Sequence, residues 1–265
     1  MKYYSNINDV KKGSTFVLTN KNYNLIQKAL KINAKVICDI NVNDKNAKKV
    51  NNPLKYLNKK LLKENKKLCK YTNIILLIGY KYKNEVADLT YKYLINKKEK
   101  VILLKNNSYY VNKKLYNLNY SANIEIINKL LNIAKEKNIN YFIIAINNTN
   151  IKNNYLKNLS YRLLALTDFI GNDYKFIEKE IKKTNDLFII NYDDEISKFL
   201  NFKKKKTITI GEKGIINIDL ENNSFEYEYN NYKIKNNIKN IYSYIFAYAI
   251  LTYLGYDINN IIKKC

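Results

Sequence analysis

The residue types that most often carry enzymatic chemistry are scarce in this chain of 265 residues. Histidine is absent, which excludes a Ser-His-Asp triad, a Cys-His nucleophile and a metal site with histidine ligands. The three cysteines, Cys38, Cys69 and Cys265, lie far apart and match neither the spacing of a metal site nor a disulfide framework. We therefore expect reduced thiols and a cytoplasmic protein.

One short spacing has residue types that suit phosphate. Gly79 ends an unbroken apolar run at residues 73–79, and Lys83 follows four residues later. In a phosphate-binding loop, glycine lets backbone N–H groups close around the phosphates, and a lysine reaches the terminal ones. By itself the spacing G-x-x-x-K carries little information, so its interpretation depends on the elements around it.

The strongly basic charge is a second feature that could indicate function. The chain has 47 Lys and Arg residues against 23 Asp and Glu, a formal net charge of +24, yet Arg162 is its only arginine. A protein specialised to bind phosphates should use some arginines, because the guanidinium group can donate two parallel hydrogen bonds to a phosphate. Here the lysines are also dispersed along the chain, apart from the run at 203–206. We interpret the abundant Lys, Asn, Ile and Tyr as the product of A/T-rich codons. A basic nucleic-acid-binding protein, with some of the 26 tyrosines stacked on bases, is kept as an alternative.

Apolar periodicity predicts alternating strands and helices along the chain. Strands are expected at residues 15–19, 35–40, 73–79, 100–104, 141–146, 163–166, 187–191, 206–210, 215–220 and 224–229. Helices are expected at residues 23–32, 52–67, 84–94, 123–137, 175–183 and 241–254, with Gly255 in the C-terminal turn of the last. Such alternation favours an α/β fold with a mostly parallel sheet and right-handed crossovers. The apolar run at 73–79 is typical of a strand buried on both faces.

We expect two domains and no membrane span. The clearest boundary lies near residues 68–72, which predicts a small N-terminal α/β domain at 1–70 and a larger domain at 71–265 whose mostly parallel sheet is flanked by helices. The longest apolar run, 74–78, is far too short to cross a membrane. The start of the chain also lacks the apolar segment of a signal peptide.

Several segments, taken in order, resemble motifs of one enzyme family. Residues 10–17 read V-K-K-G-S-T-F-V and are similar to the family's opening V-x-P-G-x-x-F-V. Residues 191–194 read N-Y-D-D and resemble its N-x-D-D. Further similar stretches lie at 29–37, 78–79, 126–146, 209–211 and 240–255. In their order and spacing, from about residue 6 to the end, these stretches resemble the Mur ligase family, most closely the branch that adds the third peptide residue to UDP-MurNAc-dipeptide.

The resemblance implies a domain organisation and a set of ligands. Residues 1–70 would form a UDP-binding-type domain and residues 71–265 a P-loop NTPase-like ATPase domain, with the C-terminal ligase domain absent. ATP and Mg²⁺ are the implied cofactors. The implied nucleotide-binding residues are Gly79, Lys83, Asn240 and Ser243, and the candidate metal ligands are Asp173, Asp193 and Asp194.

The ATP loop departs from the family's G-T-N-G-K-T-T. Residues 79–85 read G-Y-K-Y-K-N-E, so Tyr82 replaces the second glycine and Asn84 replaces the hydroxyl that holds Mg²⁺. Glu85 puts negative charge where the triphosphate should lie. These departures argue against both ATP and Mg²⁺.

Other positions have changed as well. The family's metal-binding glutamate falls on Ala145, and its T-N-x-x-x-D-H falls on residues 167–173, with Asp173 in place of the histidine. The family's carbamylated lysine has two candidates, Lys179 and Lys182, between which the sequence does not choose. The D-S-R that meets the uridine nucleotide becomes N-I-N at residues 6–8.

These observations lead to one functional prediction and to an alternative beside the nucleic-acid-binding protein named above. We predict a degenerate Mur ligase-like protein of peptidoglycan-precursor synthesis, without catalytic activity, that binds a UDP-MurNAc-peptide or an active Mur ligase. The alternative is a divergent ATP-dependent ligase, which joins an amino acid to the UDP-linked peptide through an acyl phosphate. That ligase would need its missing domain from a second chain.

Overall fold

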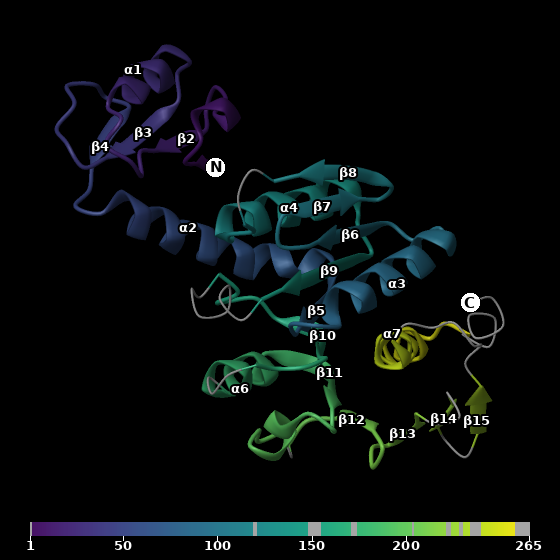
Figure 1. The fold of residues 1–265 in the computed structure, drawn as a ribbon. Coiled ribbons are helices and arrows are strands. Elements are labelled where there is room, and N and C mark those ends of the chain that lie inside the picture. The colour runs from purple at the N-terminus through teal and green to yellow at the C-terminus, as the bar shows by residue number, and fades with distance from the viewer. Residues whose placement is uncertain are drawn as a thin grey trace.

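The computed structural model describes residues 2–118, 121–147, 155–170, 174–202, 204–220, 224–227, 230–233 and 240–257. These residues form two sheets (Figure 1). The small sheet has the order β1-β2-β3-β4 and is parallel throughout. Its strands are β1 (Tyr3–Tyr4), β2 (Thr15–Val17), β3 (Lys35–Cys38) and β4 (Ala47–Lys49). The 3₁₀ turn η1 (Ile7–Asp9) and helix α1 (Asn24–Lys31) complete this small unit, with Ile26 and Ala29 of α1 packed on the sheet.

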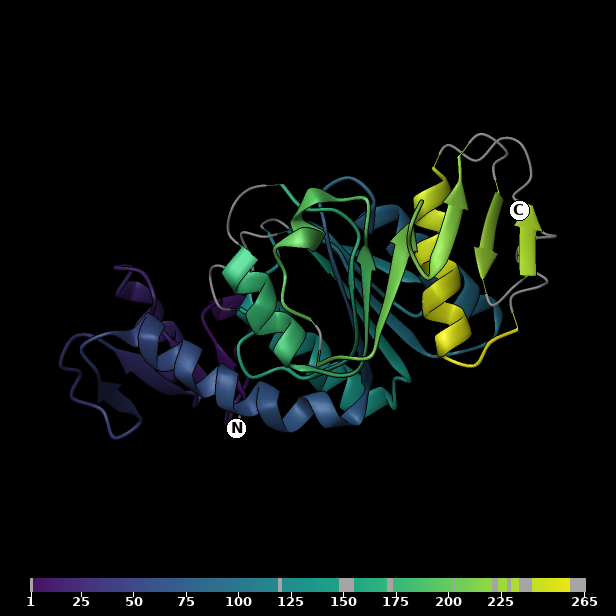
Figure 2. The same cartoon turned by 90° about the horizontal axis from the view of Figure 1, so that it is seen from below.

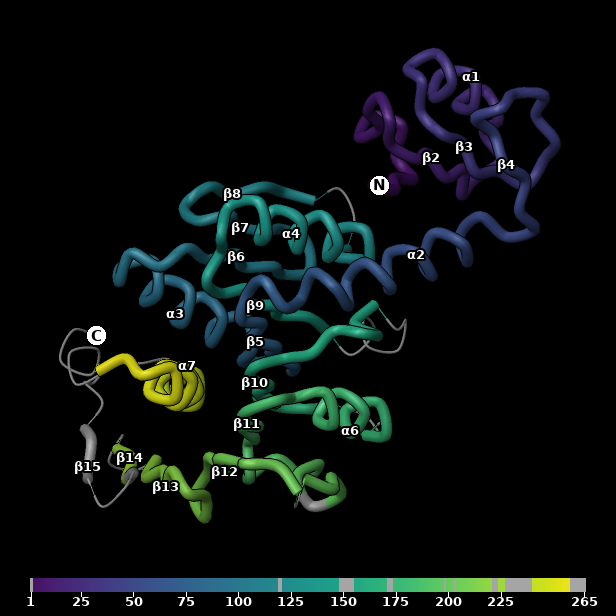
Figure 3. Tube along the Cα trace, turned by 180° about the vertical axis from the view of Figure 1, so that it is seen from behind, coloured from purple at the N-terminus to yellow at the C-terminus, as the bar shows by residue number. Residues whose placement is uncertain are grey.

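Helix α2 (Pro53–Leu68) joins the small unit to the rest of the protein. Its first residue is a proline, which has no N–H to leave unpaired in the first turn, and the Asn52 side chain caps the helix. Leu57 and Leu61 pack both against the small sheet and against Ile124 at the start of the next unit. The tube in Figure 3 shows α2 running from one unit along the other. Because α2 contacts both units, it fixes how they face each other.

The larger sheet has the order β15-β14-β13-β12-β11-β10-β5-β9-β6-β7-β8. Its middle, from β13 to β6, is parallel, and antiparallel strands complete both edges. The parallel strands are β5 (Asn73–Ile78), β6 (Val101–Leu104), β9 (Tyr141–Ile146), β10 (Tyr161–Leu166), β11 (Thr184–Asn191), β12 (Thr207–Gly211) and β13 (Ile216–Asp219). The edge strands are β7 (Ser108–Val111), β8 (Lys114–Asn117), β14 (Ser224–Tyr227) and β15 (Asn230–Lys233).

Helices cover both faces of the larger sheet (Figure 2). Helices α3 (Lys83–Asn96) and α7 (Ile241–Tyr253) pack on one face, and α4 (Ile124–Lys137) and α6 (Tyr174–Lys182) pack on the other. The side chains of β5 alternate between these two cores, so the strand is buried on both faces, as its apolar run predicts.

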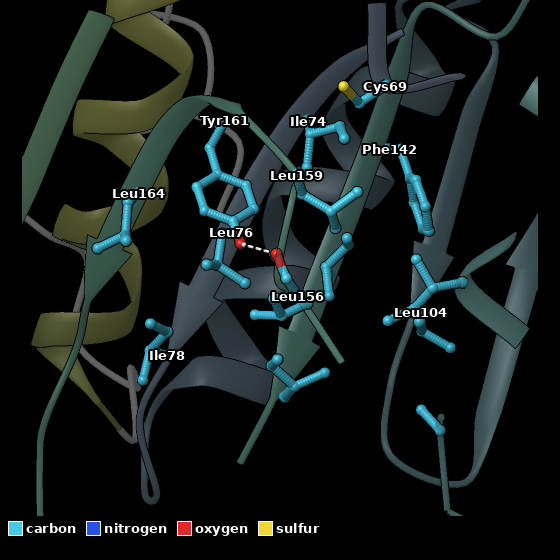
Figure 4. Close-up of a cluster of buried hydrophobic side chains, with 14 of the residues drawn as sticks. Cys69, Ile74, Leu76, Ile78, Leu104, Phe142, Leu156, Leu159, Tyr161 and Leu164 are labelled. Carbon is cyan, nitrogen blue, oxygen red and sulfur yellow. Dashed lines mark hydrogen bonds between the residues drawn. The ribbon is translucent and has the colours of Figure 1, made fainter. Parts of the chain in front are cut away.

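Figure 4 shows part of the core on the α4 side, where Tyr161 is fully buried among Ile74, Leu76 and Leu164. The Tyr161 hydroxyl donates a hydrogen bond to Glu180 Oε2 at 2.6 Å and lies 3.4 Å from the Leu156 carbonyl oxygen. Burial raises the pKa of this hydroxyl well above its usual range, and the Glu180 carboxylate adds to the effect. The buried polar pair therefore anchors the start of β10, which begins two residues before the predicted strand at 163–166.

The predicted fold class is confirmed, with a small parallel sheet followed by a large, mostly parallel sheet between helices. Periodicity missed β1, β4, the hairpin β7–β8 and β15, because short strands outside the buried middle do not need a long apolar run. The predicted boundary at 68–72 coincides with the end of α2 and the 3₁₀ turn η2 (Cys69–Tyr71), and the division into two domains stays a prediction. Gly255 has a φ of +87°, which fits its predicted place after α7. No helix of the described residues is long and apolar enough to cross a membrane.

Candidate functional site

The segment 79–82 lies between β5 and α3, at the carboxyl edge of the parallel strands. Its backbone N–H groups point at one side chain, Asp168, which comes just after the neighbouring strand β10. The N–H groups of Tyr80 and Lys81 donate to Asp168 Oδ2 at 2.9 and 2.8 Å, and that of Tyr82 donates to Oδ1 at 3.2 Å. The Thr167 hydroxyl donates to the same Oδ1 at 2.8 Å. Four donors thus converge on one carboxylate.

Gly79 is needed where the loop meets these residues. A Cβ atom at this position would lie 2.0 Å from Thr167 Oγ1 and 2.7 Å from Asp168 Oδ1. Any other side chain would therefore force the loop and the end of β10 apart. The predicted Gly79 is placed at the site, and the reason it must be glycine is its closeness to Thr167 and Asp168.

Lys83 is the first residue of α3, and only 2% of its surface is exposed. Burial lowers the pKa of its ammonium group, while the Asp168 carboxylate acts in the opposite direction. Within the described ranges, no hydrogen bond or ion pair to the Lys83 side chain is found. The loop therefore combines converging N–H groups with a buried cation.

The predicted residues Asn240 and Ser243, at the start of α7, lie beside the first turn of α3. The Ser243 hydroxyl donates to Glu85 Oε2 at 2.8 Å, and Asn240 Nδ2 donates to the same oxygen at 3.3 Å. The structure thus brings the four predicted nucleotide-binding residues to one end of the sheet. The polar groups of Asn240 and Ser243 are occupied by the acid that replaces the family's threonine.

An aromatic pair covers the region between the loop and α7. The rings of Tyr82 and Tyr242 stack with centroids 5.7 Å apart and an interplanar angle of 13°. The Tyr242 hydroxyl donates to Asp193 Oδ2, and both burial and this hydrogen bond raise the pKa of the hydroxyl. The Glu212 N–H also donates to Asp193, at 3.1 Å to each carboxylate oxygen.

The candidate metal ligands Asp193 and Asp194 follow β11, and both are engaged in holding loops. Asp194 caps the 3₁₀ turn η3 (Glu195–Lys198) through the Ile196 N–H and also accepts from the Phe169 N–H at 2.8 Å. The third candidate, Asp173, lies outside the described residues. Across the ranges that the structure describes, no group of three or more Cys, Asp and Glu side chains is arranged to hold a metal ion.

The ATP and Mg²⁺ implied by the family pattern do not fit the loop as it is arranged. A phosphate needs the N–H groups of residues 80–82, and Asp168 already accepts from all three. The sequence contained one indication of an acid at this site, because Asp168 stands where the family's T-N motif has its asparagine and Thr167 keeps the threonine. Its significance depended on knowing that β10 is the neighbour of β5.

A separate cavity of about 560 Å³ lies between the small unit and the larger one. Lys2, Tyr4, Asn6 and Lys11 line it from the small unit, and Tyr109, Tyr116 and Lys129 line it from the larger unit. Two contacts hold the walls together. Ser5 donates through its hydroxyl and its N–H to Glu125 at 2.6 and 3.1 Å, and Lys2 Nζ lies 2.8 Å from Glu136 Oε1. The N-I-N segment at 6–8, matched to the family's uridine-binding D-S-R, contributes Asn6 and Asn8 to this cavity.

No protein-family model matches the sequence, and no curated protein matches it. Solved structures do resemble the fold. A UDP-N-acetylmuramoyl-L-alanyl-D-glutamate–2,6-diaminopimelate ligase superposes with a TM-score of 0.74 at 12% identity, over 99% of this chain and 61% of that one. The MurF ligase from Thermotoga maritima, in complex with ADP, gives 0.65 at 15% identity, over 97% of this chain and 64% of that one.

A more distant likeness extends to a bifunctional folylpolyglutamate synthase/dihydrofolate synthase with Mn, AMPPNP and L-glutamate bound. Its TM-score is 0.55 at 11% identity, over 75% of this chain and 58% of that one. This chain therefore spans about 61–64% of the length of the two Mur ligases. At such low identity the likeness concerns the fold alone, and on that ground the described chain has a Mur ligase-like fold.

Proposed function

We propose that this chain is a non-catalytic Mur ligase-like protein that binds a UDP-MurNAc-peptide, the kind of precursor used in peptidoglycan synthesis. The observation that carries the proposal is the cavity between the two units, whose lining offers groups that suit the nucleotide part of such a ligand. The likeness to ligases of cell-wall precursors supports the choice of ligand class.

The cavity offers two kinds of contact that a nucleotide sugar needs. Its volume of about 560 Å³ lies within the usual range for small-molecule sites. Lys11 and Lys129 line it beside Asp9, Glu125 and Glu136, and no ion pair is found for either lysine among the described residues, so these two are the cations available to a diphosphate. The stacked rings of Tyr109 and Tyr116, 4.9 Å apart, give this wall an aromatic edge for a uracil ring, since Lys114 Nζ lies over the Tyr116 ring.

The proposal that the chain is non-catalytic rests on the loop after β5 and the residues around it. Forming an acyl phosphate from ATP requires Mg²⁺ and positive groups around the transferred phosphoryl group. Here Glu85 places a carboxylate beside Ser243 and Asn240, and Asp168 holds the loop. Ala145, buried near the end of β9, offers no ligand where the family has its metal-binding glutamate.

Calorimetric titration of the purified chain with UDP-MurNAc-dipeptide tests the binding half of the proposal. We expect saturable heat, weakened roughly three- to tenfold by Lys11→Ala or Lys129→Ala. Lys45→Ala, which removes an exposed lysine of the small unit away from the cavity, serves as the matched control and should bind as the wild type. Absence of heat from a folded protein would refute binding.

A phosphate-release assay tests the other half. The chain is incubated with Mg-ATP, UDP-MurNAc-dipeptide and a mixture of amino acids, and we expect no release above the buffer rate. ATP-dependent ligation or hydrolysis by the purified chain would overturn the non-catalytic proposal and favour a divergent ligase.

A further inference from the structure

The loop at 79–83 has the properties of an anion site, and its occupant belongs to the chain itself. Successive N–H groups at the start of a helix form a concave site for a negative group, because the helix dipole and the N–H dipoles point the same way. In this protein Asp168 accepts from the N–H groups of Tyr80, Lys81 and Tyr82 at 2.8–3.2 Å. Both carboxylate oxygens are used, so the side chain makes the contacts that a phosphate group would make.

Lys83 is a second, independent indication of an anion at this place. A buried ammonium group is unfavourable unless negative charge lies near it. Lys83 is 2% exposed, and Asp168 is the acid whose charge acts on it. The two are not in ion-pair contact within the described residues, so the ammonium group of Lys83 lacks a direct anionic partner there.

Asp168 is held in the loop by a rigid support. It follows β10 directly, and the carbonyl oxygen of Thr167 accepts a hydrogen bond from Asn191 Nδ2 at 3.1 Å. The N–H of Thr167 donates to the carbonyl oxygen of Ile78 at 2.9 Å, which continues the pairing of β10 with β5. These bonds fix the main chain just before Asp168, so its carboxylate starts from a fixed point beside the loop N–H groups.

We propose that Asp168 is a tethered anion that occupies the phosphate position of the 79–83 loop, and that the loop accepts an external phosphate or diphosphate group only when this carboxylate is removed. A second anion and Asp168 would compete for the same three N–H donors and would repel each other. The neutral amide of Asp168→Asn keeps the shape of the side chain but binds the N–H groups more weakly, so an external anion can displace it.

The test is calorimetric titration with sodium pyrophosphate, without metal ions, on four proteins. Asp168→Asn should bind pyrophosphate at least about tenfold more tightly than the wild type. Asp186→Asn makes the same chemical change near the start of β11, away from the loop, and should behave as the wild type. Adding Lys83→Met to Asp168→Asn should abolish the gain, because the buried cation is then lost.

The proposal would be overturned by a folded Asp168→Asn that binds pyrophosphate no more tightly than the wild type. Amide hydrogen exchange on the wild type decides the matter if Asp168→Asn does not fold. The N–H groups of residues 80–82 should be protected without ligand and unchanged by pyrophosphate, and a ligand-induced rise in protection would contradict the proposal. These readouts use neither the sugar nucleotide nor turnover, so their failure is separate from failure of the proposed function.

Discussion

The cavity between the units and the loop after β5 differ in how their polar groups are used. In the cavity, the contacts of Ser5 and Lys2 join the two walls, while Lys11 and Lys129 line the space without an ion pair among the described residues. In the loop, the N–H donors meet Asp168. One region leaves two lysines without an ion pair among the described residues, and the other satisfies its N–H groups from within the chain. An acid that follows a strand can therefore satisfy the N–H groups of a neighbouring loop while the fold stays intact.

Asp168→Ala should have the largest effect on the free energy of unfolding, because it removes the acceptor that distinguishes the loop from the cavity. It leaves three loop N–H groups without their acceptor and Lys83 without its anion, so we expect a loss of about 3 kcal/mol in the free energy of unfolding. Urea denaturation measures it, and millimolar pyrophosphate should restore part of the loss in the variant only. Equal stability of variant and wild type would show that the carboxylate does not hold the loop.

Gly79→Ala should have the next largest effect. Its Cβ would overlap Thr167 Oγ1, and relieving the overlap should cost about 1–3 kcal/mol of unfolding free energy. Gly13→Ala is the control, because Gly13 has a φ of +78° but no atom within 4 Å of an added Cβ. Gly13→Ala should lose only about 1 kcal/mol of unfolding free energy, which is the cost of a Cβ atom in the left-handed backbone conformation. If both variants lose the same amount, close packing of the loop is not the reason for Gly79.

Ser5→Ala tests the contact between the walls of the cavity, and its expected effect on stability is smaller. It removes the hydroxyl bond to Glu125 but leaves the N–H bond, so we expect about 1 kcal/mol less stability by urea denaturation. Because the bond joins the cavity walls, UDP-MurNAc-dipeptide should bind more weakly, while pyrophosphate binding to Asp168→Asn should not change. A change at both sites would mean that the two regions are coupled.

The smallest effect concerns pH. Since burial lowers the pKa of Lys83 below its unfolded value of 10.5, the unfolded chain binds more protons between the two pKa values, and stability should rise with pH in that window. Lys83→Met should lack this rise. In Asp168→Asn the pKa should fall further, and the rise should start at lower pH. Urea denaturation at several pH values from 7 to 10 measures the slope, and a wild-type slope equal to that of Lys83→Met would contradict the assignment.

The sequence predicted the buried middle of the fold better than its edges. The run that became β5 was readable because parallel strands covered by helices need apolar side chains on both faces. The exposed residues of β4 and β8 gave no such pattern. The match to the family located Gly79, Lys83, Asn240 and Ser243 at one site, but the binding roles of these residues stay predictions.

By itself, the sequence determined the alternation of strands and helices and the absence of histidine chemistry, because both depend only on which residues occur and at what spacing. Only the tertiary structure decided which acid meets which donor. Asp168 lies 86–88 residues from the loop N–H groups it accepts from, and Glu85 lies 158 residues from Ser243. Such pairs come together because β10 pairs with β5 and α7 packs beside α3, and hydrogen bonds at 3 Å depend on that pairing rather than on local pattern.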